Sequence, residues 1–180
     1  MRLIEDEAPQ LHYIFYYLLK KKIDAIVSGD YDCYIELTML FETIASPLLS
    51  KVERHNLREV KKAMKKYIYL IRQEYSKNIE RIKDENELRN FTKFAEDLER
   101  YIEYRFSHLI ARILMQALSK KCFEDIIPPD ASKYNIKEEF QDLIEDLNIK
   151  LQTYGFSAPD LSDIQIRQKD EEVKEEWIAE

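Results

Sequence analysis

The sequence predicts an all-α protein: an elongated bundle of about five helices, with a long antiparallel helical pair and an acidic C-terminal tail. Three observations support this prediction. Only two of the 180 residues are glycine and five are proline, too few turn residues for an all-β fold. Hydrophobic residues make up 45% of the chain and charged residues 35%, a mixture that suits long amphipathic helices. Apolar residues also recur every three or four positions.

The first helix is expected over residues 9–27, with Pro9 in its first turn, where the missing N–H costs no hydrogen bond. Gly29 is placed to end this helix in a left-handed conformation. Asp30 can cap a second helix, which Pro47 ends. The expected inward residues are Leu11, Ile14, Phe15, Leu18, Leu19, Ile23 and Ile26 in the first helix and Tyr34, Leu37, Phe41 and Ile44 in the second.

The third and fourth helices form the predicted long pair. Ser50 and Glu53 have the spacing of a capping box at the start of the third helix. A second capping pattern at Asp84–Glu87 predicts a break, although one continuous helix is also compatible with the sequence. The fourth helix is expected over residues 87–124. The apolar stripes are Leu57, Val60, Met64, Ile68, Ile71, Tyr75, Ile79 and Ile82, then Leu88, Phe91, Ala95, Leu98, Ile102, Phe106, Leu109, Ile113 and Ala117.

Each long helix would measure about 50 Å at 1.5 Å per residue. This is more than a compact monomeric bundle of 180 residues needs. We therefore expect the pair to leave apolar surface for a partner subunit, in a homo- or hetero-oligomer.

Composition divides the chain into four parts. Residues 1–125 are predicted to form the helical bundle domain, and residues 126–134 a linker containing Pro128 and Pro129. Residues 135–155 read as a short acidic helix, and residues 156–180 as an acidic, flexible tail. The expected core face of the short helix is Ile136, Phe140, Leu143, Leu147 and Leu151.

Charge is unevenly distributed along the chain. Residues 51–83 contain eleven Lys and Arg against four Asp and Glu, whereas residues 135–180 contain five against thirteen. These two segments either have different electrostatic partners or pair with each other.

Two groups of basic residues form a candidate basic surface. The first four turns of the third helix contain Arg54, Arg58, Lys61, Lys62, Lys65 and Lys66, and the fourth helix places Arg105, His108 and Arg112 on one face. Such residues can bind nucleic-acid phosphates, with Tyr101 available for stacking. They can equally form ion pairs inside the protein or between subunits.

The sequence offers no motif for catalysis. Two isolated glycines cannot build a phosphate-binding loop, and His-Glu-x-x-His and Cys-x-x-Cys motifs are absent. We therefore expect a protein that is not an enzyme and binds no cofactor or metal. Cys33 and Cys122 are interpreted as reduced core residues. The longest apolar run, residues 13–19, is too short to span a bilayer, so a cytoplasmic protein without membrane contact is expected.

The end of the acidic tail contains a candidate partner-binding segment. Val173 and Trp177 are four residues apart, so a transient helix would align them, together with Ile178, as anchors for a partner groove. The alternative is a disordered terminus that only increases solubility.

Residues 87–165 resemble the helical domain of the GINS family, whose members form a scaffold beside the MCM helicase in DNA replication complexes. The resemblance lies in an aromatic and basic helix end at residues 99–113, the loop with Pro128 and Pro129, the acidic helix at residues 137–147 and the loop at residues 156–161. It implies a non-catalytic subunit of a replication assembly.

The sequence thus predicts a non-enzymatic helical scaffold or adaptor subunit that acts through protein–protein contacts. Two other functions remain open. One is an acidic inhibitor or nucleic-acid mimic of viral or plasmid origin, which would use the carboxylates of residues 135–180. The other is direct nucleic-acid binding through the basic face of residues 51–66.

Overall fold

The computed structural model describes residues 2–121 and 127–168 of the chain. Within these residues the protein is an all-α bundle, as the sequence predicts, and contains no strand. The α-helices in the described residues are α1 (Arg2–Ser28), α2 (Asp32–Ala45), α3 (Lys51–Ile79), α4 (Glu85–Leu118) and α5 (Ile136–Thr153). Three single-turn 3-10 helices accompany them: η1 (Ser46–Leu48), η2 (Ser119–Lys121) and η3 (Ala131–Lys133).

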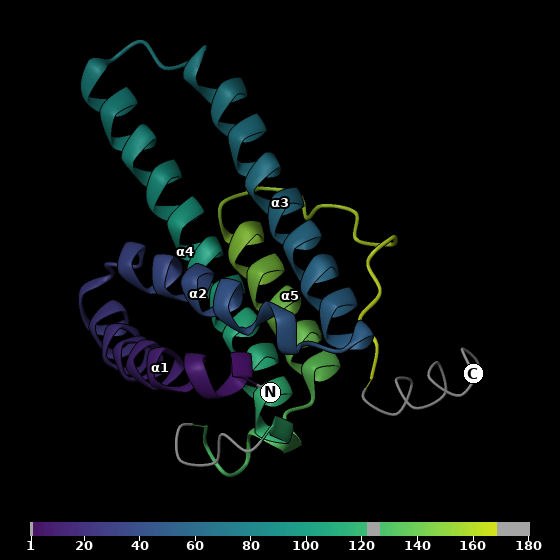
Figure 1. The fold of residues 1–180 in the computed structure, drawn as a ribbon. Coiled ribbons are helices and arrows are strands. Elements are labelled where there is room, and N and C mark those ends of the chain that lie inside the picture. Colours follow the sequence, from purple (N-terminus) through teal and green to yellow (C-terminus); the bar gives the residue numbers. More distant parts are fainter. Residues whose placement is uncertain (1, 122–126, 169–180) are drawn as a thin grey trace.

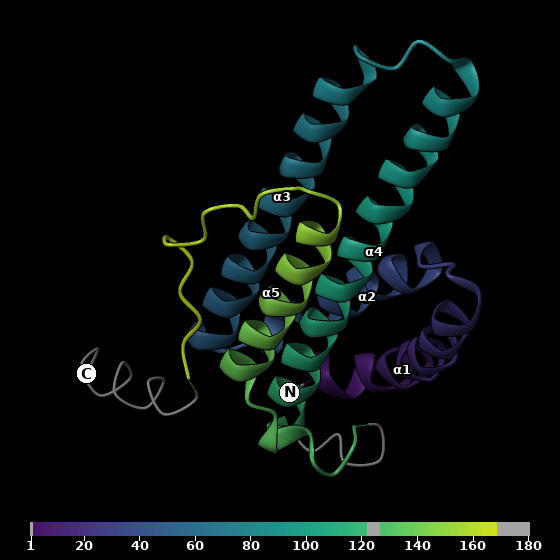
Figure 2. The same cartoon turned by 180° about the vertical axis from the view of Figure 1, so that it is seen from behind.

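Helix α4 is the centre of the bundle and packs against α2, α3 and α5, while α1 packs on α2 (Figures 1 and 2). The reason lies in its sequence from Leu98 onward, where apolar residues occur on every side of the helix. A helix that is hydrophobic all round is stable only when neighbours surround it. Its buried apolar residues are Leu98, Ile102, Tyr104, Phe106, Leu109, Ile110, Ala111, Ile113, Leu114, Ala117 and Leu118.

The upper halves of α3 and α4 project beyond the other helices as a two-helix hairpin (Figure 1). The two helices are separate, because Asp84 caps α4 by accepting a hydrogen bond from the Asn86 N–H at 3.1 Å. Their apolar side chains face each other, as in the stacked rings of Tyr75 and Phe91, whose centroids are 5.7 Å apart. The long pair therefore covers much of its own apolar surface, contrary to our expectation.

The predicted helix ends are confirmed where local chemistry defines them. Ser50 and Glu53 form both hydrogen bonds of a capping box at the start of α3. Asn135 caps α5 by accepting from the Glu138 N–H at 3.1 Å. Gly29 has a φ of 75°, and its N–H donates to the Ala25 carbonyl at 2.9 Å, so it ends α1 in the left-handed conformation.

Helix α1 differs from the prediction in two ways. It begins at Arg2, so Pro9 lies inside the helix, where its ring removes one backbone hydrogen bond. Leu19, Ile23 and Ile26 were expected to point inward, but all three are exposed. Helix α1 has apolar residues on both sides, and α2 covers only the side that includes Leu11, Ile14, Phe15, Leu18 and Ala25.

Three smaller differences concern packing and helix length. Cys33 is exposed on α2 instead of lying in the core, and Cys122 is outside the described residues. The regular α-helix of α4 ends at Leu118, earlier than expected, and η2 follows it. On α3 the buried stripe runs through Val60, Ala63, Tyr67 and Ile71, whereas Met64 and Ile68 are half-buried at its edge.

Residues 156–168, here named the strap, also differ from the expected flexible tail. The strap leaves the end of α5 and crosses to α3 (Figure 2). Ile166 is buried, and Phe156, Leu161 and Ile164 pack against the core. The strap can pack in this way because α3 and α5 lie side by side (Figure 2), and both present apolar and polar groups to it.

Candidate interaction surfaces

Most of the predicted basic residues on α3 have partners within the protein. Lys61 pairs with Glu42 of α2 at 2.6 Å. Lys62 and Lys66 both contact Asp163 of the strap. The Arg54 guanidinium donates to the carbonyls of Leu49 and Ser46, each at 3.2 Å. Arg58 and Lys65 are exposed and have no partner among the described residues.

The two lysine contacts of Asp163 also change the pKa of its carboxyl group. Its hydrogen bonds with Lys66 and Lys62 lower the pKa of the Asp163 carboxyl to about 2. The carboxyl is fully exposed to solvent, so these ion pairs contribute little to stability. For these residues, the basic and acidic segments of the sequence do pair with each other.

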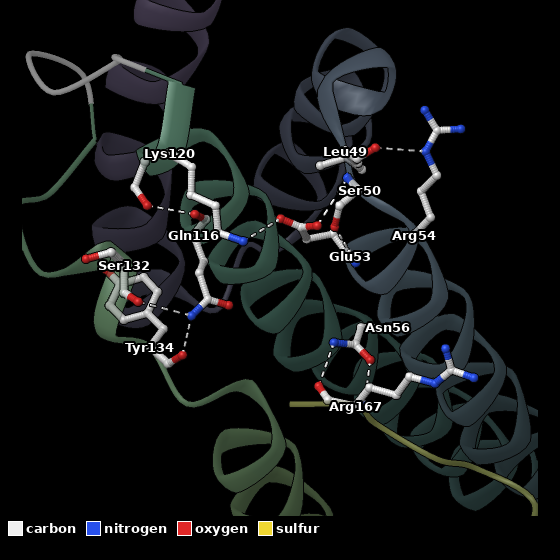
Figure 3. A network of polar contacts seen from close by, with 11 residues as sticks. Leu49, Ser50, Glu53, Arg54, Asn56, Gln116, Lys120, Ser132, Tyr134 and Arg167 are labelled. Atoms are coloured by element: carbon white, nitrogen blue, oxygen red, sulfur yellow. Dashed lines mark hydrogen bonds and ion pairs between the residues drawn. The ribbon is translucent and has the colours of Figure 1, made fainter. Parts of the chain in front are cut away.

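Main-chain contacts hold the end of the strap more firmly. The buried Asn56 side chain of α3 binds the backbone of Arg167 twice, donating to its carbonyl at 3.0 Å and accepting from its N–H at 2.9 Å (Figure 3). His55 Nε2 lies 2.8 Å from the Gln165 carbonyl. The side chains of α3 thereby satisfy backbone groups of an extended segment, as a neighbouring β-strand would do.

A polar cleft of about 240 Å³ lies beside this contact, between α3, the end of α4, and the start of α5. Glu53 is buried at its wall and accepts from the Ser50 N–H at 3.1 Å and from Lys120 Nζ at 3.3 Å (Figure 3). Gln116 of α4 donates to the carbonyls of Tyr134 and Ser132. The polar groups of the wall are thus largely occupied in joining α3, α4 and η3.

The three basic residues predicted on one face of α4 have partners in different parts of the bundle. Arg105 donates to the Tyr101 hydroxyl at 2.7 Å and to Asp146 of α5 at 3.1 Å. Arg112 pairs with Glu139 of α5 and lies over the Tyr134 ring, 3.9 Å from its centroid. These contacts use both cations to attach α5 and the segment before it to α4.

His108 is directed toward α1 and α2 instead. Its Nδ1 lies 3.3 Å from the hydroxyl of Tyr34, with which it shares a hydrogen bond. Burial and, to a lesser extent, the neighbouring charges of Lys22, Arg112 and Arg105 lower the pKa of His108 to about 3. His108 is therefore a neutral, structural side chain at physiological pH.

The largest apolar surface that remains uncovered is on α1. Of the twelve large hydrophobic side chains exposed in the described part of the chain, six belong to this helix. We name them the α1 outer face, and they are Tyr13, Tyr16, Leu19, Ile23, Ile26 and Val27. Their exposed fractions range from 48% for Leu19 to 82% for Val27. Figures 1 and 2 show α1 at the edge of the molecule.

The α1 outer face is continuous along the helix. Tyr16, Leu19, Ile23 and Ile26 are spaced by three, four and three residues, so they form one stripe at helical periodicity. The ring of Tyr13 packs against that of Tyr17 with centroids 4.8 Å apart, which widens the stripe on one side. Such a stripe is the pattern of a helix that packs against another helix.

Sequence reasoning assigned three of these six residues to the core and did not identify the outer face. The signal was present in the run Tyr13–Leu19, where seven consecutive residues are apolar or aromatic. Seven such residues encircle almost two turns, so they cannot all belong to one side of a surface helix.

The predicted partner-binding residues Val173, Trp177 and Ile178 lie outside the described residues. Within residues 2–121 and 127–168, no cluster of three or more His, Cys, Asp or Glu side chains could hold a metal ion. In the same residues no helix is long and apolar enough to cross a bilayer.

Comparisons with protein-family models, with curated proteins and with solved structures found no match to this chain. The resemblance of residues 87–165 to the GINS family therefore stays a prediction.

Proposed function

We propose that this protein is a non-enzymatic helical scaffold or adaptor subunit, and that the α1 outer face is its docking surface for another protein. The single observation that supports this proposal is the uncovered apolar stripe of α1. Six large apolar side chains exposed on one helix form a continuous patch, and soluble monomers rarely keep large apolar patches uncovered.

The composition of this face fits a protein partner. Tyrosine combines a large apolar ring with a hydroxyl that can stay hydrated, and it is enriched in the cores of protein interfaces. Tyr13 and Tyr16 precede the aliphatic residues Leu19 and Ile23 along the helix. A nucleic acid would require a cluster of exposed cations at this position, whereas Lys21 pairs with Asp24, Lys22 is half-buried, and Lys20 is the exposed lysine of the three.

Two alternative functions have weaker support. Direct nucleic-acid binding by α3 would use six basic residues, of which three, Lys61, Lys62 and Lys66, already have carboxylate partners within the fold. An acidic mimic would use exposed carboxylates of α5, namely Glu138, Asp142, Glu145 and Asp146. A place in a DNA replication assembly is the more specific form of the scaffold proposal, and it is supported by the resemblance alone.

The test is affinity purification of the tagged full chain from its native cell, with mass spectrometry of the co-purified proteins. Three forms are compared: the wild type, Ile23→Lys on the α1 outer face and Ile149→Lys on α5. Ile23 and Ile149 are matched, because their exposed fractions are 63% and 59%. A protein that co-purifies with the wild type and the Ile149→Lys control, but is lost with Ile23→Lys, supports the proposal.

The salt dependence of partner binding distinguishes the scaffold function from the acidic-mimic function. An apolar interface persists in 0.5 M salt, whereas contacts made by exposed carboxylates are screened. If the complex dissociates in salt and the Ile23→Lys form binds as well as the wild type, the mimic is favoured. If no protein co-purifies and the chain has a monomeric mass, the scaffold proposal is wrong.

A further inference from the structure

The α1 outer face has properties that identify its occupant more closely. Its four central residues, Tyr16, Leu19, Ile23 and Ile26, have the same spacing when they are read from either end of the helix. Two copies of this stripe can therefore pack antiparallel. Each of the four apolar residues of one copy then lies opposite an apolar residue of the other. A surface that complements itself in this way is the requirement for a twofold symmetric dimer.

We infer that a second copy of this chain covers the α1 outer face, in an antiparallel pairing of two α1 helices about a twofold axis level with Lys21. This inference rests on the proposed function and specifies its partner. In this register Tyr16 lies opposite Ile26 of the second copy, and Leu19 lies opposite Ile23 of the second copy. The same two contacts recur on the other side of the axis, which gives four apolar levels.

The area of the face is also adequate for a dimer. The six side chains expose roughly 760 Å² in total, taking about 200 Å² for a large side chain. Stable interfaces bury about 800 Å² on each partner, and the polar margin of the helix would contribute the remainder.

The position of α1 in the fold permits this pairing. The helix lies at the edge of the molecule, and the projecting hairpin of α3 and α4 extends away from it (Figures 1 and 2). The buried side of α1 packs against α2. This contact fixes the orientation of the helix, so that its outer face points to solvent.

The first experiment measures the mass of the full chain in solution by sedimentation. The monomer has a mass of 21.7 kDa, and we expect the wild type to have about twice this mass at micromolar concentration. Ile23→Lys places two unpaired cations in the dimer interface, and it should raise the dissociation constant on the order of a hundredfold or more. Ile149→Lys, the matched control on α5, should remain dimeric.

The second experiment tests the direction of pairing with single cysteines in a chain that carries Cys33→Ser and Cys122→Ser. In the Lys20→Cys variant, the two cysteines of the dimer lie next to the twofold axis, and a short bis-maleimide should cross-link them. Two copies of Tyr13→Cys are separated by sixteen residues along the axis, about 24 Å, so they should not be cross-linked. Both positions are exposed, so neither substitution affects the core.

Each outcome distinguishes the inference from the proposed function. A dimer that Ile23→Lys leaves intact, or one that cross-links at Tyr13→Cys but not at Lys20→Cys, overturns the inference. A monomeric chain whose binding to a different protein is abolished by Ile23→Lys also overturns it, but the scaffold proposal then stands. A monomeric chain in which Ile23→Lys changes no binding overturns both.

Discussion

His108 shows how strongly the fold controls the chemistry of a single residue. The imidazole lies among Lys22, Arg105 and Arg112, and it is largely excluded from water. Both the burial and the neighbouring cations oppose its protonation. Because the histidine pKa is about 3 in the folded protein and near 6.5 in the unfolded chain, its protonation favours unfolding.

This difference predicts a stability that depends on pH. Between pH 6.5 and pH 3 the unfolded chain binds a proton that the folded protein does not. The contribution is therefore fully present above pH 6.5 and is lost as the pH falls toward 3. We expect His108 to account for a loss of about 2 kcal/mol between pH 7 and pH 5. Urea unfolding of the wild type and of His108→Gln at both pH values measures this loss.

The control for this experiment is His12→Gln, at an exposed position of α1. It should keep the pH dependence of the wild type. If His108→Gln has the same pH dependence as the wild type, folding does not lower the pKa of His108 and this prediction is wrong.

At the scale of elements, α3 and α4 each have two parts with different surroundings. The lower part of α4 is enclosed by α2, α3 and α5, whereas its first turns contact mainly α3 in the projecting hairpin. Phe106 is fully buried in the lower part, and Phe91 is half-buried in the hairpin. The same type of substitution should therefore have different effects at these two positions.

We expect Phe106→Ala to destabilise the whole fold by about 3–5 kcal/mol, because it leaves a cavity in an enclosed core. Phe91→Ala removes its stacking on Tyr75 and should cost about 0.5–1.5 kcal/mol. Urea unfolding gives both values. In hydrogen exchange, Phe91→Ala should accelerate the amides of residues 72–97 only, since local opening of the hairpin need not disturb the lower bundle. Acceleration throughout α4 would show that the hairpin and the bundle unfold as one unit.

At the scale of the whole molecule, the strap joins the C-terminal part of the described chain to the beginning of α3. The ion pairs of Asp163 are exposed and contribute little, so the strength of this contact depends on Ile166 and on Asn56. Asn56 satisfies two backbone groups of Arg167 in a buried position. Such groups are costly when they lose their partner.

Asn56→Ala should therefore destabilise the protein by about 1–3 kcal/mol and expose the strap to proteolysis. The control is Asn78→Ala on the same helix, whose amide donates only to the Glu74 carbonyl one turn earlier, at 2.7 Å. Limited proteolysis with mass spectrometry locates the cleavage, and we expect it within residues 156–168 for Asn56→Ala alone. Equal cleavage in both variants would mean that the Asn56 contacts do not hold the strap.

The sequence by itself determined the all-α class, the five helices and those helix ends that local capping defines. Capping by Ser50, Asp84 and Asn135 and termination at Gly29 are interactions between residues within one helical turn, so the sequence contains all their participants. The core face of α5 was also predictable, because α5 has only one apolar side.

Tertiary structure alone decided which side of α1 is buried, which basic residues of α3 and α4 have acidic partners, and where residues 156–168 lie. Leu11 and Ile23 are equally apolar in the sequence, and only the position of α2 makes one of them core and the other surface. Lys66 and Asp163 are 97 residues apart, and Asn56 and Arg167 are 111 apart. Such contacts depend on how distant segments pack together, and the periodicity of one helix does not contain that information.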